Sequence, residues 1–210
     1  MAGISGGKNY HHGDLRNALL CAAVGLAAEG GPERVVLREA ARRVGVSPTA
    51  AYRHFDGRGE LLRTVRGHAR ARLAEAMERA AAREPGSDDP ALAAERRLAA
   101  LCRGYVGFAV EHPGLYRAAF GTVRPAGDAP AGLPVPPEPE IRAFALLREA
   151  MDALDRTGGR RPAAGAAAWS AVHGLSLLLL EGPLRRLSAQ RRADVVETTL
   201  AMVVSGARGR

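Results

Sequence analysis

The chain has 210 residues, enough for one large domain or for a small domain joined to a medium one. Hydrophobic residues make up 47% of it but aromatic residues only 4%, so alanine and leucine must supply the core, which favours helices over sheets. The two cysteines, Cys21 and Cys102, are too few and too far apart for a disulfide framework. Both fall in apolar stretches, where we expect buried, reduced thiols.

The formal charge of +8 is concentrated near the amino terminus. Residues 1–72 hold 12 Lys or Arg and 6 Asp or Glu, whereas residues 73–210 hold 18 and 16. This distribution predicts a polyanion-binding amino-terminal part joined to a nearly neutral remainder. The alternative is a set of solvated arginines scattered over helix surfaces.

Residues 162–180 carry no formal charge and resemble a membrane span in that respect. They include proline, glycine, serine and histidine and barely reach the roughly 20 apolar residues that a bilayer requires, so we predict a buried helix instead. The first residues lack the apolar segment of a secretory signal. We therefore expect a cytoplasmic protein.

Apolar residues recur at helical spacing and predict an all-α fold of about nine helices. We expect helices over residues 14–29, 37–44, 48–55, 58–83, 91–111, 138–157, 162–181 and 189–205, with a further short helix that ends at residue 120. We find no internal repeat and no credible strand. The Pro/Gly/Ala-rich residues 122–137 predict a mobile loop.

Residues 34–66 are the most informative part of the chain. They predict two short helices joined by a turn, with a longer helix following. Gly45 allows the left-handed turn, Ser47 is a natural N-cap and Pro48 a natural first helical residue. This is the pattern of a helix-turn-helix, which places its second helix in the major groove of DNA. The sequence therefore predicts a DNA-binding protein.

Helical spacing divides the expected second helix into two faces. The side chains expected to pack inward are Val46, Ala51 and Phe55. Those expected to face outward are Thr49, Ala50, Tyr52, Arg53 and His54. Thr49 and Ala50 are small enough to let the helix lie deep in the groove and to contact thymine methyl groups. Arg53 can reach either a guanine edge or a phosphate, and the sequence leaves both open.

The amino-terminal residues resemble the DNA-binding domain of the TetR family of bacterial transcriptional regulators. The resemblance rests on YHHGDLR at residues 10–16, LREAARRVGVSPTAAYRHF at residues 37–55 and LL at residues 61–62. The remainder is similar to the family's ligand-binding and dimerisation domain in helix count and order. WSAVHG at residues 169–174, following EHPGLY at 111–116, resembles the TetR subgroup named for a Trp-His-Gly signature. Two departures are Val36 and Leu37 where many members place threonine, and Gly57 and Gly59 where polar and acidic residues are common.

The resemblance assigns roles to individual DNA-binding residues. It implies phosphate contacts for Tyr52 and His54, a base-edge contact for Arg38, and a phosphate contact for Arg58 at the start of the next helix. The expected DNA-binding set is Arg38, Ser47, Pro48, Thr49, Ala50, Tyr52, Arg53, His54 and Arg58. The alternatives are that Tyr52 is half-buried core and that Arg38 pairs with a neighbouring glutamate.

These expectations divide the chain into four segments. They are a flexible basic arm over residues 1–12, a DNA-binding domain over 13–60, a connecting helix over 61–84, and a ligand-binding and dimerisation domain over 85–210. The arm carries Lys8, Tyr10, His11 and His12, which either order on DNA or remain a solvated tail.

One such DNA-binding domain is too small to find its site in a genome, and two-fold dimers that read palindromes solve this problem. The last two long helices are the candidate homodimer surface, packed as a four-helix bundle between subunits. Its expected residues are Leu175, Leu178, Leu179, Val195, Val196, Leu200 and Val203. The alternative is that these residues form core within one chain.

Trp169 and His173 are four residues apart and share one helix face. The other residues expected beside them are Tyr105, Phe108, His112, Tyr116, Phe120 and Phe144. An apolar pocket with a few polar groups would bind a small, largely hydrophobic effector. The alternatives are an aromatic core with a hydrogen-bonded histidine, and a helix-capping role for His112.

The resemblance implies a ligand-responsive repressor that binds a double-stranded DNA operator, with an activator of the same fold as the alternative. Ligand binding would shift the fourth helix and spread the DNA-binding domains. An enzyme is disfavoured because the chain has no HExxH, Cys-x-x-Cys, Walker loop or serine elbow, so we expect no catalytic residue, metal or cofactor. A non-specific nucleoid protein is disfavoured because the carboxy-terminal part is nearly neutral.

Overall fold

The computed structural model describes residues 12–121, 141–154 and 162–207, without the side chains of residues 12–14 and 162. The predicted loop over residues 122–137 and nearly all of the predicted arm lie outside this description. Across the described ranges the regular structure is nine α-helices and two short 3₁₀ helices, with no strand. This confirms the predicted all-α class.

The helices follow the predicted order. They are α1 (His12–Gly30), η1 (Pro32–Arg34), α2 (Leu37–Val44), α3 (Pro48–Tyr52), α4 (Gly57–Ala82), α5 (Pro90–Glu111), α6 (Pro113–Phe120), α7 (Arg142–Leu154), α8 (Pro162–Leu180), η2 (Pro183–Arg186) and α9 (Ala189–Ala207). The prediction that α3 extends to residue 55 is wrong. The chain turns after Tyr52 to begin α4 at Gly57, whose φ of 77° lies in the left-handed region that glycine tolerates.

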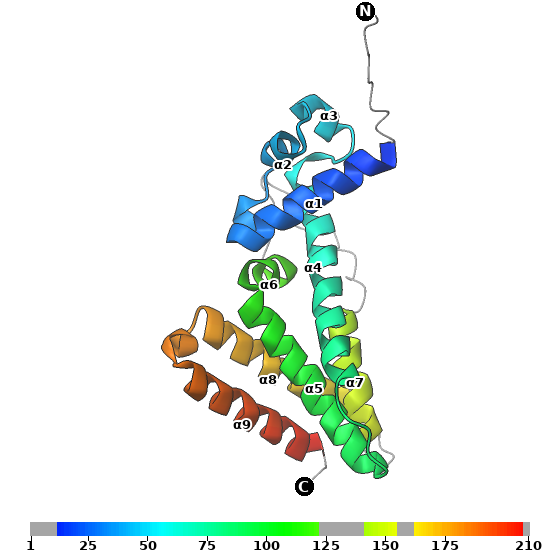
Figure 1. The fold of residues 1–210 in the computed structure, drawn as a ribbon, viewed down its shortest axis with the longest axis vertical. Helices are drawn as coiled ribbons and strands as arrows, with labels where there is room; N and C mark the ends of the chain where they lie inside the picture. The colour runs from blue at the N-terminus through cyan, green and yellow to red at the C-terminus, as the bar shows by residue number, and fades with distance from the viewer. Residues whose placement is uncertain (1–11, 122–140, 155–161, 208–210) are drawn as a thin grey trace, which may run out of the picture.

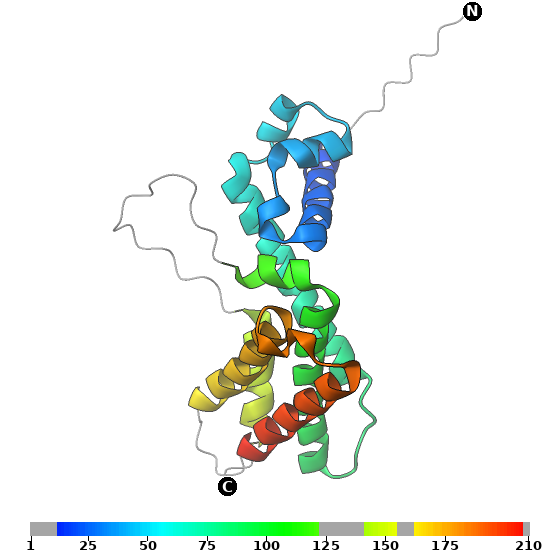
Figure 2. The same cartoon turned by 90° about the vertical axis from the view of Figure 1, so that its left-hand side faces the viewer.

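Two groups of helices are joined by α4 (Figures 1 and 2). We call residues 12–56, with α1, α2 and α3, the head, and residues 90–207, with α5 to α9, the body. Helix α4 begins under the head and runs along α5 into the body. The molecule is therefore elongated, with the helix-turn-helix at one end and the α8–α9 pair toward the other.

One hydrophobic core runs through both groups, from Leu19 in α1 to Ala207 in α9. Helix α4 connects the two ends because it buries one residue in every turn along its length. These fully buried residues are Leu61, Val65, Ala69, Leu73 and Met77. Head and body therefore share apolar contacts and are not two separate cores on a linker.

The short helix α6 is wedged between the head and the body. Gly114 lies against the backbone of α1, and a β-carbon at this position would overlap the carbonyl oxygens of Ala27 and Ala28. From α4, Arg66 donates a hydrogen bond to the carbonyl of Gly121 (2.8 Å) and Arg70 donates one to the carbonyl of Ala119 (3.0 Å). These two guanidinium groups bind carbonyls that the end of a helix leaves without intrahelical donors.

Helix α8 contains the stretch Ala163–Leu180, which is long and apolar enough to cross a membrane by length and composition. The prediction of a buried helix is only partly right, because 33% of that stretch is buried. Val172 and Ser176 are fully buried, whereas Leu177 and Leu178 on the other face are 40% and 44% exposed. Helix α8 is therefore a half-buried helix that packs on α5 and α7.

The two cysteines differ in environment. Cys102 is buried as predicted, and burial raises the pKa of its thiol to about 12. The prediction that Cys21 is buried is wrong, because its side chain is exposed. Helix α1 buries Leu19 and Ala23, and a residue two positions from Leu19 lies nearly on the opposite side of a helix.

Thiol chemistry checks this assignment. We expect the native protein to react rapidly with one equivalent of a disulfide reagent such as DTNB, and to react with the second only after unfolding. Cys21→Ser should abolish the rapid reaction, whereas Cys102→Ser should leave it unchanged. Rapid reaction of Cys102 in the native protein would show that the packing around α5 is misassigned.

Gly114→Ala tests the contact between α6 and α1. We expect it to lower the free energy of unfolding by about 1–3 kcal/mol, the usual cost of an extra methyl group in well-packed surroundings. Gly107→Ala in α5 is the matched control, because a β-carbon there meets nothing within 4 Å. That change should stabilise the chain by about 0.5–1 kcal/mol. Urea unfolding measures both, and equal effects of the two substitutions would contradict the wedge.

Candidate functional site

Local sequence signals build the helix-turn-helix. Gly45 ends α2 with φ 78° and ψ 29°, and its N–H binds the carbonyls of Ala41 and Arg42. The Ser47 hydroxyl then accepts a hydrogen bond from the N–H of Ala50 (3.2 Å), which caps α3. The turn chemistry predicted from these two residues is confirmed.

The faces of α3 divide as the spacing predicts. Ala51 and Phe55 are buried, and Val46 packs partly buried against the core. The residues on the outward side that are exposed are Ser47, Pro48, Thr49, Tyr52 and Arg53, while Ala50 and His54 are half-buried. Tyr52 is 50% exposed and does not belong to the hydrophobic core cluster.

Arg38 is exposed in the first turn of α2. The neighbouring carboxylate of Glu39 is occupied by Arg42, which donates two hydrogen bonds of 2.9 and 2.7 Å, and by Arg43 at 3.6 Å. The hydrogen bonds from Arg42 lower the pKa of Glu39 to about 2. Arg43 also pairs with Glu29 at 2.7 Å, which ties α2 to α1. Glu39 therefore serves these two arginines, and Arg38 does not pair with it.

Arg58 has a structural role that the sequence did not reveal. Its guanidinium donates hydrogen bonds to the carbonyls of Val35 (2.9 Å) and Pro32 (3.0 Å). These bonds fasten the start of α4 to the segment between α1 and α2. A hydrogen bond from a side chain to backbone carbonyls distant in sequence leaves no pattern in the sequence. The phosphate contact expected for Arg58 therefore came only from the resemblance.

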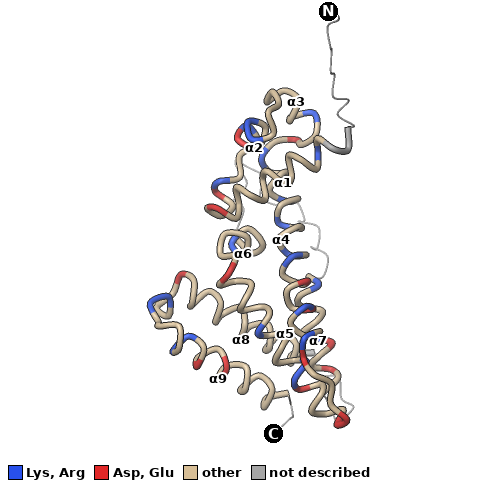
Figure 3. The backbone as a smooth tube through the Cα atoms, in the orientation of Figure 1, with Lys and Arg blue, Asp and Glu red and all other residues tan. Residues whose placement is uncertain are grey.

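Basic residues of the head lie on α1, η1 and α2 and directly after α3, and others follow along α4 (Figure 3). Not all of them point to a partner outside the chain. Arg16 lies over the ring of Phe55, with 4.6 Å from its guanidinium carbon to the ring centroid, and pairs with Glu60 at 3.2 Å. Arg38 in α2 and Arg53 directly after α3 are exposed and form no ion pair within the part of the chain that the structure describes.

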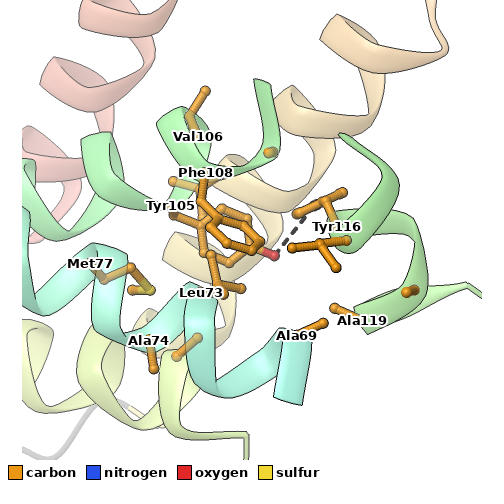
Figure 4. Close-up of a cluster of buried hydrophobic side chains, with 14 of the residues drawn as sticks. Ala69, Leu73, Ala74, Met77, Tyr105, Val106, Phe108, Tyr116 and Ala119 are labelled. Atoms are coloured by element: carbon orange, nitrogen blue, oxygen red, sulfur yellow. Dashed lines mark hydrogen bonds between the residues drawn. The ribbon is translucent and has the colours of Figure 1, made fainter. Parts of the chain in front are cut away.

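In the body, six of the eight predicted effector-site residues come together from four helices. They are Tyr105 from α5, Tyr116 and Phe120 from α6, Phe144 from α7, and Trp169 and His173 from α8; we call them the aromatic cluster. Figure 4 shows Tyr105 reaching from α5 toward Tyr116, with Ala69, Leu73 and Met77 of α4 beside them. The rings of Trp169 and His173 stack with 5.7 Å between centroids.

A hydrogen-bonded triad lies inside the aromatic cluster. The hydroxyls of Tyr105 and Tyr116 each lie 2.8 Å from Nδ1 of His173, and 3.4 Å from each other. Burial raises the pKa of both tyrosines, that of Tyr116 to about 12, and lowers the pKa of His173. The lowered pKa of His173 favours the neutral imidazole at pH 7, in which one ring nitrogen donates a hydrogen bond and the other accepts one.

The centre of this cluster is filled. Tyr105 and Tyr116 are 0% and 1% exposed, and their hydroxyls satisfy each other and His173. Of the two sequence interpretations, packed core with a hydrogen-bonded histidine describes the centre better than an open pocket. Phe108 and His112 form a separate pair, with 5.1 Å between ring centroids. The backbone of His112 caps the junction of α5 and α6, since its N–H donates to the carbonyl of Phe108 and its carbonyl accepts from the N–H of Tyr116.

An open cavity lies beside the filled cluster. It has a volume of about 260 Å³ and lies among η1 of the head, α6, and α8 of the body, with Tyr116, Phe120 and His173 in its wall. A second, larger groove of about 470 Å³ among α7, α8 and α9 is lined mainly by alanines, with Met151 and Met202.

The residues predicted for the dimer surface are mostly used within the chain. Leu175, Leu179, Leu200 and Val203 are at most 9% exposed, and Val195 and Val196 pack partly buried against the core. Leu178 is the well-exposed member of the set. Apolar spacing marks the buried face of a helix but does not distinguish core from interface. The large apolar residues that α8 and α9 leave exposed are Leu177, Leu178 and Met202.

A helix-turn-helix lies at one end of the molecule, and the helical body has an open cavity and a groove. These are the features of a DNA-binding regulator with a ligand-binding domain. Residues 19–65 match the model of bacterial regulatory proteins of the tetR family, and residues 98–203 match the tetracyclin repressor-like C-terminal domain. The second match covers half of the chain. The chain therefore belongs to the TetR family of bacterial transcriptional regulators.

Solved structures share this fold. A protein of unknown function from Rhodococcus sp. RHA1 is 26% identical, with 95% of this chain and 98% of that chain covered and a TM-score of 0.66. A tetR-family transcriptional regulator from Streptomyces coelicolor is 21% identical, covering 93% and 88% with a TM-score of 0.57. The regulator FadR from Bacillus subtilis, in complex with stearoyl-CoA, is 14% identical, covering 90% and 98% with a TM-score of 0.58. No curated protein sequence matches the chain.

Proposed function

We propose that the protein is a cytoplasmic, ligand-responsive repressor that binds a palindromic DNA operator as a homodimer. The observation that carries this proposal is the outward side of α3. A serine cap fixes the helix, its inward residues anchor it in the core, and Tyr52 and Arg53 remain exposed, as does Arg38 on α2. A surface of this kind offers hydrogen-bond donors and small side chains to the major groove.

In this proposal the residues on the outward side of the head have different roles in DNA binding. Tyr52 and the half-buried His54 hold phosphates, Arg38 reads a base edge, and Thr49 and Ala50 allow close approach. Arg58 stabilises the head and is not assigned to phosphate, since its guanidinium binds two carbonyls.

A dimer supplies the second head. The surface we assign to it is the outer side of α8 and α9, where Leu177, Leu178 and Met202 are 40%, 44% and 70% exposed. Exposed large apolar side chains on two long neighbouring helices suit a four-helix bundle between subunits. FadR's complex with stearoyl-CoA supports an effector-binding role for the body, without indicating which effector this chain takes.

Operator binding tests the assignment of the reading face. A pool of genomic fragments selected on the purified protein should yield one palindromic site. Arg38→Ala and Tyr52→Ala should each weaken binding to it by about 1–3 kcal/mol. Arg97→Ala is the control for Arg38→Ala. It removes one positive charge at an exposed position of α5 in the body and should leave operator affinity unchanged. Full affinity in both head variants, or selection of no common sequence, would sink the proposal.

Sedimentation velocity tests the dimer surface. We expect the wild type to sediment as a dimer and Leu178→Arg as a monomer, because a buried charge in the bundle would have no partner. Val36→Arg is the matched control, since Val36 is 42% exposed in the head and outside the proposed surface. If the Leu178→Arg variant is still a dimer, the interface lies elsewhere and the proposed surface is wrong.

A further inference from the structure

The cavity of about 260 Å³ is placed where the head meets the body. Pro32 and Glu33 of η1 form its head side, and α6 and α8 form the rest. Its occupant would contact both parts of the molecule at once. The larger groove among α7, α8 and α9 touches only the body.

The charged side chains of this cavity favour a cation. Glu33 and Glu181 contribute two carboxylates and Arg117 one guanidinium, while His173 is neutral because burial lowers its pKa. Neither Glu33 nor Glu181 forms an ion pair within the part of the chain that the structure describes. Among its lining residues, the wall therefore has two carboxylates and one guanidinium, a formal net charge of −1.

The apolar part of the wall fits the same kind of ligand. Phe120, which is only partly buried, presents an aromatic ring that suits the carbon skeleton of such a ligand. The tyrosine hydroxyls occupy Nδ1 of His173, so a ligand at this imidazole meets its Nε2 side.

We propose that this cavity is the effector site and that it takes a small organic amine carrying an aromatic or other apolar group. The ammonium group pairs with Glu181 and Glu33, and the apolar group lies against Phe120 and Tyr116. This assignment rests on the proposed function. It adds the class of effector and moves the site from the filled centre of the aromatic cluster to its edge.

The position of the cavity links it to DNA binding. An amine held between η1 and α8 binds only when the head lies at a distance that lets both sides contact it. If that distance differs between the DNA-bound and unbound states, the ligand changes operator affinity, and the operator changes ligand affinity by the same factor.

Trp169 is the single tryptophan of the chain and stacks on His173, so its fluorescence reports on this cavity. The probe is 2-phenylethylamine, and the matched control is 3-phenylpropanoate, which has a similar shape and the opposite charge. We expect a saturable change in Trp169 emission with the amine and a much weaker response to the acid. Glu181→Gln should weaken amine binding about tenfold, the loss expected for one charge-assisted contact. Asp152→Asn, on the exposed side of α7, should leave it unchanged.

The same preparations are tested for operator binding, which separates the two proposals. Operator binding without any saturable response to the amine, or with equal amine affinity in the wild type and Glu181→Gln, overturns the cavity assignment and leaves the regulator intact. If the wild type binds no operator, the proposed function itself is overturned. Amine binding that is sensitive to Glu181 and alters operator affinity supports the assignment.

Discussion

The contact of α6 with the backbone of α1 is the constraint on which the rest of the molecule depends. It requires a residue without a β-carbon at Gly114, because the carbonyls of α1 lie where that atom would be. Arg66 and Arg70 hold the other end of the same helix by binding its last carbonyls from α4. Helix α6 can therefore neither turn nor slide without disturbing the head and α4 together.

In the proposed function, this constraint is what lets the body act on the head. Tyr116 and Phe120 extend from α6 into the aromatic cluster, where His173 of α8 holds the Tyr116 hydroxyl at 2.8 Å. These side chains join α8 to α6, and α6 is in contact with α1, η1 and α4. Because packed interiors do not deform continuously, a displacement at one end of such a chain of contacts moves the other end as a unit.

Local chemistry made the fold predictable, and long-range contacts made parts of the site unpredictable. Ser47, Pro48 and Gly45 act within one turn of the chain, so residue type alone predicted the helix-turn-helix and the outward face of α3. The aromatic cluster followed from residue type and helix face, but its filled centre and the neighbouring cavity depend on how four helices meet. The partners of Arg58 could not be predicted because they are backbone carbonyls distant in sequence. The burial of the leucines of α8 could not be predicted because one apolar pattern serves core and interface alike.

The central claim is that head, α4 and body form one cooperative unit tied together at α6, with one core from Leu19 to Ala207. Differential scanning calorimetry of the purified protein tests it most directly. The predicted result is a single heat-absorption peak whose calorimetric enthalpy equals its van't Hoff enthalpy. Two separate transitions, one for the head and one for the body, would contradict the claim and remove the mechanical basis for coupling an effector to DNA.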